Sequence, residues 1–195
     1  MQFKYENMEK PKPFDAAYQD LLAKGIEDFV DREKIPNVVG FLKYLVQEKG
    51  YLLHGSSNKE IKELEPRQAN CKSKKFGNEM GVYAVQDEVL PVFYAIKDAK
   101  KAHKAGVSSF SAESGFSSVD DKKDYTFKIT KAFIDADAWS DGSIYILDGK
   151  TFEQGEDDEG EPIDEWLSKE PVMPVGKVKV DKDDFPYFTD IEPVE

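Results

Sequence analysis

The chain changes from helical to strand periodicity at Tyr51-Leu52-Leu53-His54-Gly55-Ser56. The first four residues form a short run rich in apolar and β-forming side chains, and Gly55-Ser56-Ser57-Asn58 is a turn-rich sequence that stops it. This pattern predicts a buried strand with His54 at its end. The fold therefore includes a sheet, and the sequence on either side of this strand indicates what accompanies it.

Two amphipathic helices are predicted before this strand. Apolar side chains recur every three or four residues over residues 14–30, and again from Pro36 to Gly50. A proline suits the first turn of a helix, and a glycine suits its end. We therefore expect residues 1–50 to form an N-terminal helical segment packed on a core formed by residues 51–195.

Further strands and one helix are predicted downstream. The segments with strand-like composition are Gly81–Val85, Tyr125–Ile129, Glu165–Ser168 and Val172–Val180. Residues 91–103 fit a helix with Phe93, Tyr94 and Ile96 turned inward. The tail after Asp181 is expected to be peripheral. Because strands and helices mix within one short chain, the predicted fold class is α+β.

Three turn or loop regions are predicted between these elements. Asp148-Gly149, flanked by Ser143–Leu147 and Lys150–Phe152, is a signal for a two-residue type I′ hairpin. Residues 108–124 are rich in Ser, Gly and Asp and are expected to form a turn region, and residues 66–78 a polar loop. Because the strand pattern Tyr125–Ile129 follows residues 108–124 at once, that region is not expected to be a linker between domains, and a single core is implied.

Composition argues against several classes of function. The formal net charge is −12 and no long basic stripe offsets it, so binding through phosphate neutralisation, and with it a nucleic-acid substrate, is disfavoured. The chain has no run of about 20 apolar residues and no signal-peptide pattern at its N-terminus, so we expect a cytoplasmic protein that does not bind membranes. A single cysteine, Cys71, allows no internal disulfide.

Three of the predicted strands carry a residue suited to chemistry: His54, Tyr83 and Glu165. Taken singly, each residue type is more often structural or solvated than functional. Together they place polar groups on rigid elements, which is where catalytic groups gain precision. Two histidines and one cysteine leave no recognisable zinc spacing, and the acidic residues from Asp135 to Gly142 do not match a calcium loop, so no metal site is expected.

The residues around this triad resemble a known family. Leu52-Leu53-His54-Gly55-Ser56, Gly81-Val82-Tyr83-Ala84 and Asp164-Glu165-Trp166-Leu167-Ser168, in this order, are similar to the three signature strands of the His-Tyr-Glu class of ADP-ribosyltransferases, especially the poly(ADP-ribose) polymerase catalytic domain. His54 and Tyr83 are 29 residues apart, and Tyr94 follows 11 residues later, where that family has a second stacking tyrosine. The resemblance covers residues 51–180.

The resemblance implies a split antiparallel sheet that binds NAD, the donor of ADP-ribose. It implies that Glu165, His54 and Tyr83 are catalytic. The implied NAD-binding residues are His54, Gly55, Ser56, Tyr83, Tyr94 and Arg67, with Lys74 and Lys75 near the pyrophosphate. The acidic residues 153–164 would lie where the family recognises its acceptor, a protein or a small molecule. These residue types suit the chemistry, because nicotinamide is a flat cationic ring and its departure leaves an oxocarbenium-like centre that a carboxylate stabilises.

Two positions depart from the family pattern. Pro91 stands where the family has a serine that bonds the nicotinamide carboxamide. Ile163, two residues before Glu165, replaces the Glu or Gln of arginine-modifying relatives, which argues against arginine as the acceptor. Two alternatives therefore stand beside the transferase: a non-catalytic module that binds NAD, ADP-ribose or a protein, and an enzyme that only hydrolyses NAD.

Overall fold

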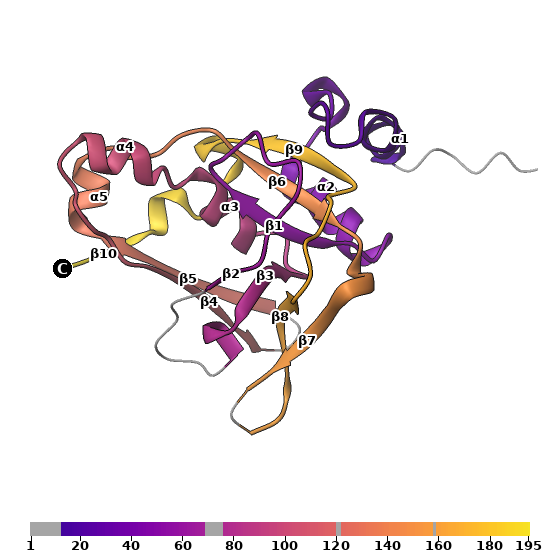
Figure 1. The fold of residues 1–195 in the computed structure, drawn as a ribbon. Coiled ribbons are helices and arrows are strands. Elements are labelled where there is room, and N and C mark those ends of the chain that lie inside the picture. The colour runs from indigo at the N-terminus through magenta and orange to yellow at the C-terminus, as the bar shows by residue number, and fades with distance from the viewer. Residues whose placement is uncertain (1–12, 69–75, 120–121, 158) are drawn as a thin grey trace, which may run out of the picture.

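The computed structural model describes residues 13–68, 76–119, 122–157 and 159–195 (Figure 1). Its α-helices are α1 (Asp15–Lys24), α2 (Val38–Gln47), α3 (Leu90–Ile96), α4 (Ala99–Lys104) and α5 (Lys131–Asp135). Its strands are β1 (Leu52–Ser56), β2 (Arg67–Gln68), β3 (Met80–Val85), β4 (Ala112–Val119), β5 (Lys122–Thr130), β6 (Gly142–Leu147), β7 (Phe152–Glu156), β8 (Pro162–Ser168), β9 (Gly176–Val180) and β10 (Glu192–Val194). Within the described ranges, no helix combines the length and apolarity needed to cross a lipid bilayer.

The described strands form two sheets. The large sheet has the order β7-β8-β3-β1-β6-β9, with β2 added to β3, and all its pairings are antiparallel. The small sheet has the order β10-β5-β4, in which β4 and β5 are antiparallel and β10 is parallel to β5. Antiparallel sheets accompanied by a few helices make this an α+β fold, as predicted.

The two N-terminal helices are shorter than predicted. The first was expected over residues 14–30, but α1 ends at Lys24 because Gly25 adopts a positive φ of 56°. The second was expected from Pro36, but Asn37 caps α2 by accepting a hydrogen bond from the Gly40 backbone N–H at 2.6 Å. A good N-cap residue outweighs a proline one position earlier.

The single helix predicted over residues 91–103 is two helices. α3 ends at Ile96, and Asp98 caps α4 by accepting from the backbone N–H of Lys101 at 2.9 Å. Phe93 and Ile96 are buried as predicted, whereas Tyr94 is 41% exposed. The apolar periodicity of the sequence continues across Asp98, but the helix does not. The Asp98 side chain bonds a backbone N–H and so competes with the helical hydrogen bonds.

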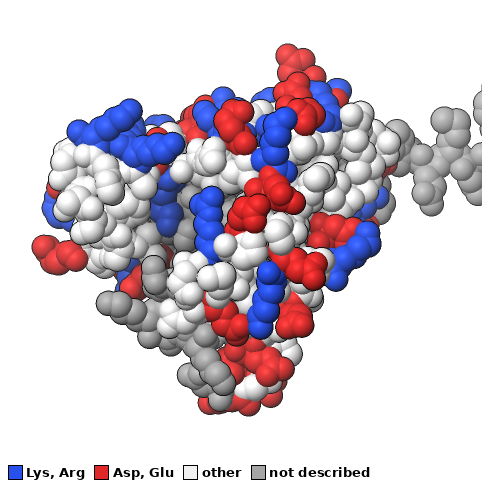
Figure 2. Space-filling view, in the orientation of Figure 1, with Lys and Arg blue, Asp and Glu red and all other residues white. Residues whose placement is uncertain are grey.

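The hairpin predicted at Asp148-Gly149 is wrong. β6 pairs with β1 and β9, whereas β7 pairs with β8. Asp148 instead caps a short 3₁₀ turn over Gly149–Thr151, accepting from the backbone N–H of Lys150 at 3.2 Å. The chain therefore leaves β6 and forms its hairpin later, between β7 and β8. Figure 2 shows acidic side chains at the tip of that hairpin, where Glu156, Asp157, Glu159 and Glu161 are exposed.

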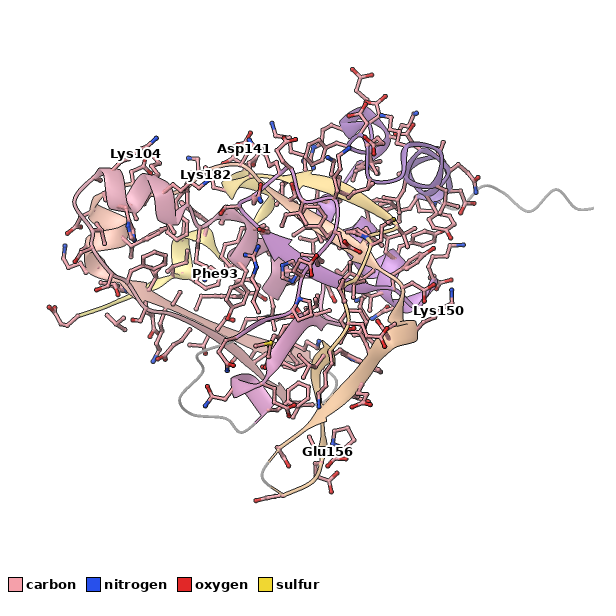
Figure 3. All side chains as sticks on the ribbon, viewed as in Figure 1. Phe93, Lys104, Asp141, Lys150, Glu156 and Lys182 are labelled. Carbon is pink, nitrogen blue, oxygen red and sulfur yellow. The ribbon has the colours of Figure 1, made fainter. Side chains whose placement is uncertain are left out.

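Two further predictions, for residues 108–124 and for the tail after Asp181, are wrong. Residues 108–124 were expected to be a turn region, but they contain β4, which pairs with β5 along its whole length. The tail after Asp181 was expected to be peripheral, but Phe185 is buried against Phe93 and Phe127, with ring centroids 5.7 and 4.8 Å away. Figure 3 shows Phe93 in the interior of the molecule. Aromatic packing thus joins the small sheet to α3.

The main core lies between the helices and the sheets. Its fully buried side chains include Leu21 of α1, Phe41 of α2, Leu53 of β1 and Ile146 of β6. These residues belong to the same cluster as Phe93 and Phe127, so both N-terminal helices are packed on the core that supports the sheets. The strand that carries His54 takes part in this core through Leu53, whereas Val82 and Ala84 of β3 belong to a second, smaller cluster with Leu52 and Tyr145.

Candidate functional site

Gly55 is the point where the large sheet and α3 come closest. A Cβ atom at Gly55 would lie 1.9 Å from the Pro91 carbonyl oxygen, far inside van der Waals contact. Only glycine therefore permits α3 to cross β1 at this distance. The crossing brings the first turn of α3 against the end of β1, and a cavity opens beside it.

A cavity of about 380 Å³ brings together most of the candidate residues. We call it the first cavity. It is lined by Leu53, His54, Gly55, Tyr83, Ala84, Val85, Leu90, Pro91, Tyr94, Ser114 and Glu165. Residues distant in sequence from four elements, β1, β3, α3 and β8, thus converge with Ser114 of β4. Its lining combines aromatic and aliphatic surface with a few polar groups, which is the usual composition of a small-molecule site.

Strand register explains which side chains share a face. Val85 pairs with Leu53 on one side and with Glu165 on the other, and Tyr83 is two residues before Val85. Because side chains alternate along a strand, Tyr83 and Glu165 lie on the same face of the sheet. His54, one residue beyond Leu53, points to the opposite face. Leu53 and Val85 are the one pair in register between β1 and β3 in the described chain.

His54 connects the two strands beyond that pair. Its Nδ1 lies 2.7 Å from the Tyr83 carbonyl oxygen. A carbonyl only accepts, so Nδ1 carries the hydrogen and the neutral ring presents Nε2 as an acceptor. Burial lowers the pKa of His54; the bond to the Tyr83 carbonyl opposes this effect and the charge of Arg67 adds to it. The imidazole is therefore held neutral at physiological pH, in one tautomer.

The ring of Tyr83 is fixed by the segment before β3. Its hydroxyl lies 2.8 Å from the Phe76 carbonyl oxygen and accepts from the Glu79 backbone N–H at 3.1 Å. The Phe76 ring meets the Tyr83 ring edge to face, with centroids 6.1 Å apart. One wall of the first cavity is thus a restrained aromatic surface.

Tyr94 forms another wall of the first cavity and is held at two points. Its hydroxyl accepts a hydrogen bond from Ser114 Oγ at 2.9 Å, and Lys97 Nζ lies 4.0 Å from the centre of its ring. Lys97 Nζ is also 4.8 Å from the centre of the Phe93 ring. Burial lowers the pKa of Lys97 to about 7. The partly exposed ring of Tyr94 is therefore oriented by contacts from α3 and from the small sheet.

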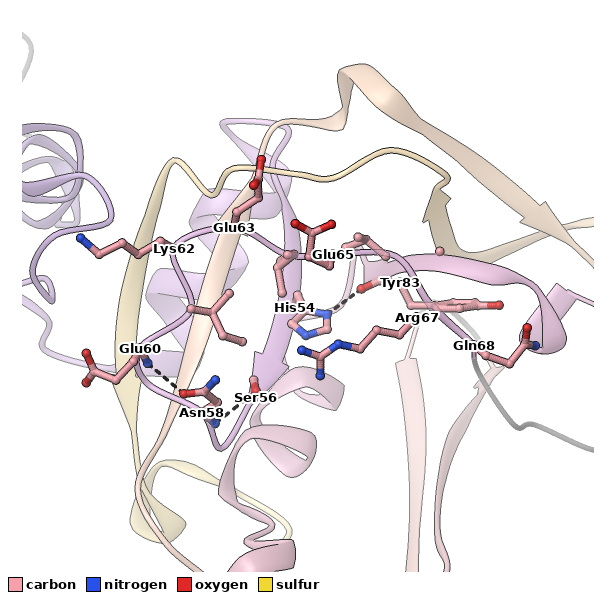
Figure 4. A pocket seen from close by; sticks show the side chains of 14 residues that line it. His54, Ser56, Asn58, Glu60, Lys62, Glu63, Glu65, Arg67, Gln68 and Tyr83 are labelled. Carbon is pink, nitrogen blue, oxygen red and sulfur yellow. Dashed lines mark hydrogen bonds between the residues drawn. The ribbon is translucent and has the colours of Figure 1, made fainter.

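A second cavity, of about 360 Å³, shares His54 and Tyr83 with the first (Figure 4). It also contains Ser56 and Arg67, whose side chain extends toward the His54 ring. Its other lining residues are Asn58, Glu60, Ile61, Lys62, Glu63, Leu64, Glu65, Gln68, Gly81 and Val82. Lys74 and Lys75 lie outside the described residues. The two cavities thus meet at His54 and Tyr83, next to the point where β1 and β3 are joined by a single pair.

Three contributing residues, Ser114, Asp87 and Lys123, were missed by sequence reasoning, and a fourth, Pro91, was identified only as a departure from the family pattern. Pro91 is buried, and its carbonyl faces Gly55, so it contributes packing to the first cavity and no side-chain hydrogen bond. Ser114 supplies the hydroxyl beside Tyr94, and Asp87 and Lys123 join the start of α3 to β5. Ser114 and Lys123 belong to the small sheet, whose first strand has a weak sequence signal. Asp87, three residues before the helix-favouring Leu90-Pro91, matches the pattern of a capping residue and could have been identified.

Comparisons with protein-family models, with curated proteins and with solved structures find no match for this chain. In the part of the chain that the structure describes, no group of three or more His, Cys, Asp or Glu side chains is arranged to hold a metal ion. The residues of the two cavities are therefore the observations from which a function can be argued.

Proposed function

We propose that this chain binds NAD on an ADP-ribosyltransferase-like fold and transfers ADP-ribose to an acceptor, releasing nicotinamide. The observation that carries the proposal is the convergence of Gly55, Tyr83, Tyr94 and Glu165 on the first cavity, with His54 shared between both cavities. Three strands and one helix contribute these residues, so their convergence is a property of the fold and not of one local motif.

The first cavity has the features that a nicotinamide ring requires. The two tyrosines offer aromatic faces, and a flat cationic ring is attracted to such faces. Gly55 has no side chain, so its backbone can approach the carboxamide closely. Pro91 offers no hydroxyl for that carboxamide, whereas Ser114 places one in the same cavity. The nicotinamide half of NAD is therefore assigned to the first cavity.

The second cavity suits the ADP half of the same molecule. The neutral His54 ring presents Nε2 as an acceptor for a ribose hydroxyl, and Ser56 lies two residues farther along β1. Arg67 is the lining cation best placed for the pyrophosphate, since Lys62 is paired with Glu27 at 3.1 Å. NAD would then extend from one cavity to the other past His54 and Tyr83, which line both.

Glu165 is assigned to the reacting centre. In the proposed reaction the bond between ribose C1 and the nicotinamide nitrogen breaks, and its electron pair leaves with neutral nicotinamide. The acceptor nucleophile then bonds to C1 and gives up a proton. A carboxylate beside C1 would hold the ribose hydroxyl and offset the positive charge that develops there. Its contribution is greatest in the transition state, so it affects turnover more than affinity.

Calorimetric titration with NAD, combined with a nicotinamide-release assay, tests this proposal. We expect binding and slow release with the wild-type chain, and binding with little release for Glu165→Gln. Absence of both binding and release at millimolar NAD would overturn the proposal. Binding without release by the wild-type chain would favour the non-catalytic module, which Pro91 supports because it removes a hydroxyl from α3.

Hydrolysis and transfer are separated by a further measurement. Mass spectrometry of the products distinguishes free ADP-ribose from ADP-ribose linked to protein. Ile163, which replaces the acidic or amide residue of arginine-modifying relatives, leads us to expect no modification of arginine side chains. Free ADP-ribose as the sole product, with every candidate acceptor present, would identify the chain as an NAD glycohydrolase instead.

A further inference from the structure

Asp87 is a buried carboxylate that joins α3 to the small sheet. Its side chain has 0% exposure, and its Oδ1 accepts from the backbone N–H groups of Val89 and Leu90 at 2.8 and 2.7 Å. Its Oδ2 accepts from Lys123 Nζ and from the Tyr125 hydroxyl, both at 2.7 Å. A buried carboxylate needs such donors to offset its lost hydration. The first turn of α3, which precedes Tyr94, is thereby tied to β5.

Lys123 also binds a second carboxylate, that of Asp164 in β8. Its Nζ lies 3.2 Å from Asp164 Oδ2, and Asp164 Oδ1 accepts from the Gln86 backbone N–H at 3.2 Å. Burial lowers the pKa of Lys123, but the two carboxylates outweigh it and raise that pKa overall. Asp164 immediately precedes Glu165. One ammonium group therefore links the turn before α3 with the strand that carries the proposed catalytic carboxylate.

We propose that Lys123 is a positioning residue that sets the location of Glu165 relative to Tyr94. This inference rests on the proposed function for the role of Glu165. A single cation holds two carboxylates from different elements that would otherwise repel one another. Without it, Asp87 keeps its backbone donors and Tyr125, whereas the Gln86 amide is the one donor left to Asp164 among the residues that the structure describes. β8 is therefore the element that shifts.

The decisive variants are Lys123→Met and Lys123→Arg, with Lys128→Met as the matched control. Lys128 lies on the same strand and pairs with Glu192 at 3.5 Å, away from both cavities. We expect Lys123→Met to lower kcat by about 10-fold or more with NAD affinity within about threefold, because small displacements of a catalytic group reduce turnover strongly. Lys123→Arg should restore most of the turnover, and the control should leave it unchanged.

A charge-repair variant separates positioning from simple stability. Burial raises the pKa of Asp164 and the Lys123 charge opposes that effect, so the loss of this cation in Lys123→Met should raise the pKa further. Activity of that variant should then recover as the pH falls and Asp164 takes up a proton. Adding Asp164→Asn should restore turnover at neutral pH. Wild-type turnover in Lys123→Met, or a loss that neither low pH nor Asp164→Asn repairs, would overturn the inference.

Amide hydrogen exchange tests the same link without any activity. In Lys123→Met, the Gln86 amide, which donates to Asp164, should exchange faster than in the wild-type chain, whereas the amides of Val89 and Leu90, which keep Asp87 as their acceptor, should not change. If the wild-type chain neither binds NAD nor releases nicotinamide, the proposed function fails, and the exchange result still decides whether Lys123 joins α3 to β8. Unchanged exchange at the Gln86 amide would overturn the link itself.

Discussion

The large sheet and the small sheet meet at the first cavity, but they supply different kinds of side chain to it. The large sheet contributes His54, Gly55, Tyr83 and Glu165, which are the groups that the proposed function assigns to NAD. The small sheet contributes Ser114, which donates to the Tyr94 hydroxyl, and Lys123, which contacts Asp87 and Asp164. We infer that the large sheet would supply the residues that react with or bind NAD, and that the small sheet would hold those residues in position.

The largest expected effect comes from the large sheet. Glu165→Gln should lower turnover by on the order of 10²-fold or more while leaving NAD affinity nearly unchanged, because the carboxylate acts mainly in the transition state. The matched control is Glu161→Gln, an exposed residue in the same hairpin. Steady-state nicotinamide release and calorimetric titration measure the two quantities. Equal turnover in the variant and the wild type would show that Glu165 of β8 is not the catalytic carboxylate.

Gly55→Ala should have the next largest effect, on stability as well as on the site. The new Cβ would lie 1.9 Å from the Pro91 carbonyl oxygen, so α3 must move away from β1. We expect a loss of about 2–3 kcal/mol in the free energy of unfolding, typical of overpacking, together with loss of NAD binding. Gly115→Ala in β4 is the control, since no atom lies within 4 Å of its Cβ position. Urea titration measures the free energy of unfolding of both variants. If Gly55→Ala is as stable as Gly115→Ala, α3 does not cross β1 at this distance.

Lys97→Met should stabilise the junction between α3 and the small sheet. Burial lowers the pKa of Lys97 to about 7, so at neutral pH and below the folded state holds a poorly hydrated ammonium. After allowing for partial exposure and the lost attraction to two rings, we expect a gain of about 1 kcal/mol at pH 7. The exposed Lys100→Met is the control.

The pH dependence of that gain has a definite sign. Between pH 7 and about 10.5 the unfolded chain holds more protons on Lys97 than the folded chain does, so this residue makes wild-type stability rise with pH. The advantage of Lys97→Met should therefore shrink over this range. Urea midpoints at pH 6, 7 and 9 measure it, and an advantage that grows with pH would contradict a lowered pKa.

Ser114→Ala should have the smallest effect, on affinity alone. It removes the donor to the Tyr94 hydroxyl and the hydroxyl available to a carboxamide in the first cavity. We expect nicotinamide to bind about threefold more weakly, which is the usual effect of losing one neutral hydrogen bond. Ser117→Ala, exposed on the same strand, is the control. Stronger nicotinamide binding in Ser114→Ala would show that the small sheet obstructs the cavity.

Sequence reasoning succeeded where a strand is apolar and buried. β1 and β3 carry the runs Leu52-Leu53 and Val82-Tyr83-Ala84, whose composition distinguishes them from helix and loop. β4 reads Ala-Glu-Ser-Gly-Phe-Ser-Ser-Val and lies at the edge of the small sheet, so neither propensity nor alternation marks it as a strand. Its contribution to the site depends on tertiary pairing with β5.

The pairing of strands was not predictable from local signals either. Asp148-Gly149 has the composition of a tight hairpin, yet β6 is bordered by β1 and β9 and no edge is left for β7. Asp148, which suggested a hairpin, instead caps a 3₁₀ turn with its side chain. Likewise, the convergence of Tyr94 and Glu165 follows from how α3 crosses β1, which Gly55 permits but does not specify.

The most direct test is a crystal structure of the chain with a nicotinamide-mimicking inhibitor bound. The account predicts that the inhibitor's ring lies in the first cavity against Tyr83 and Tyr94, with its carboxamide on the backbone of Gly55 and Glu165 facing the position of the ribose. An inhibitor bound elsewhere, or no bound inhibitor at saturating concentration, would contradict the assignment of this cavity to NAD.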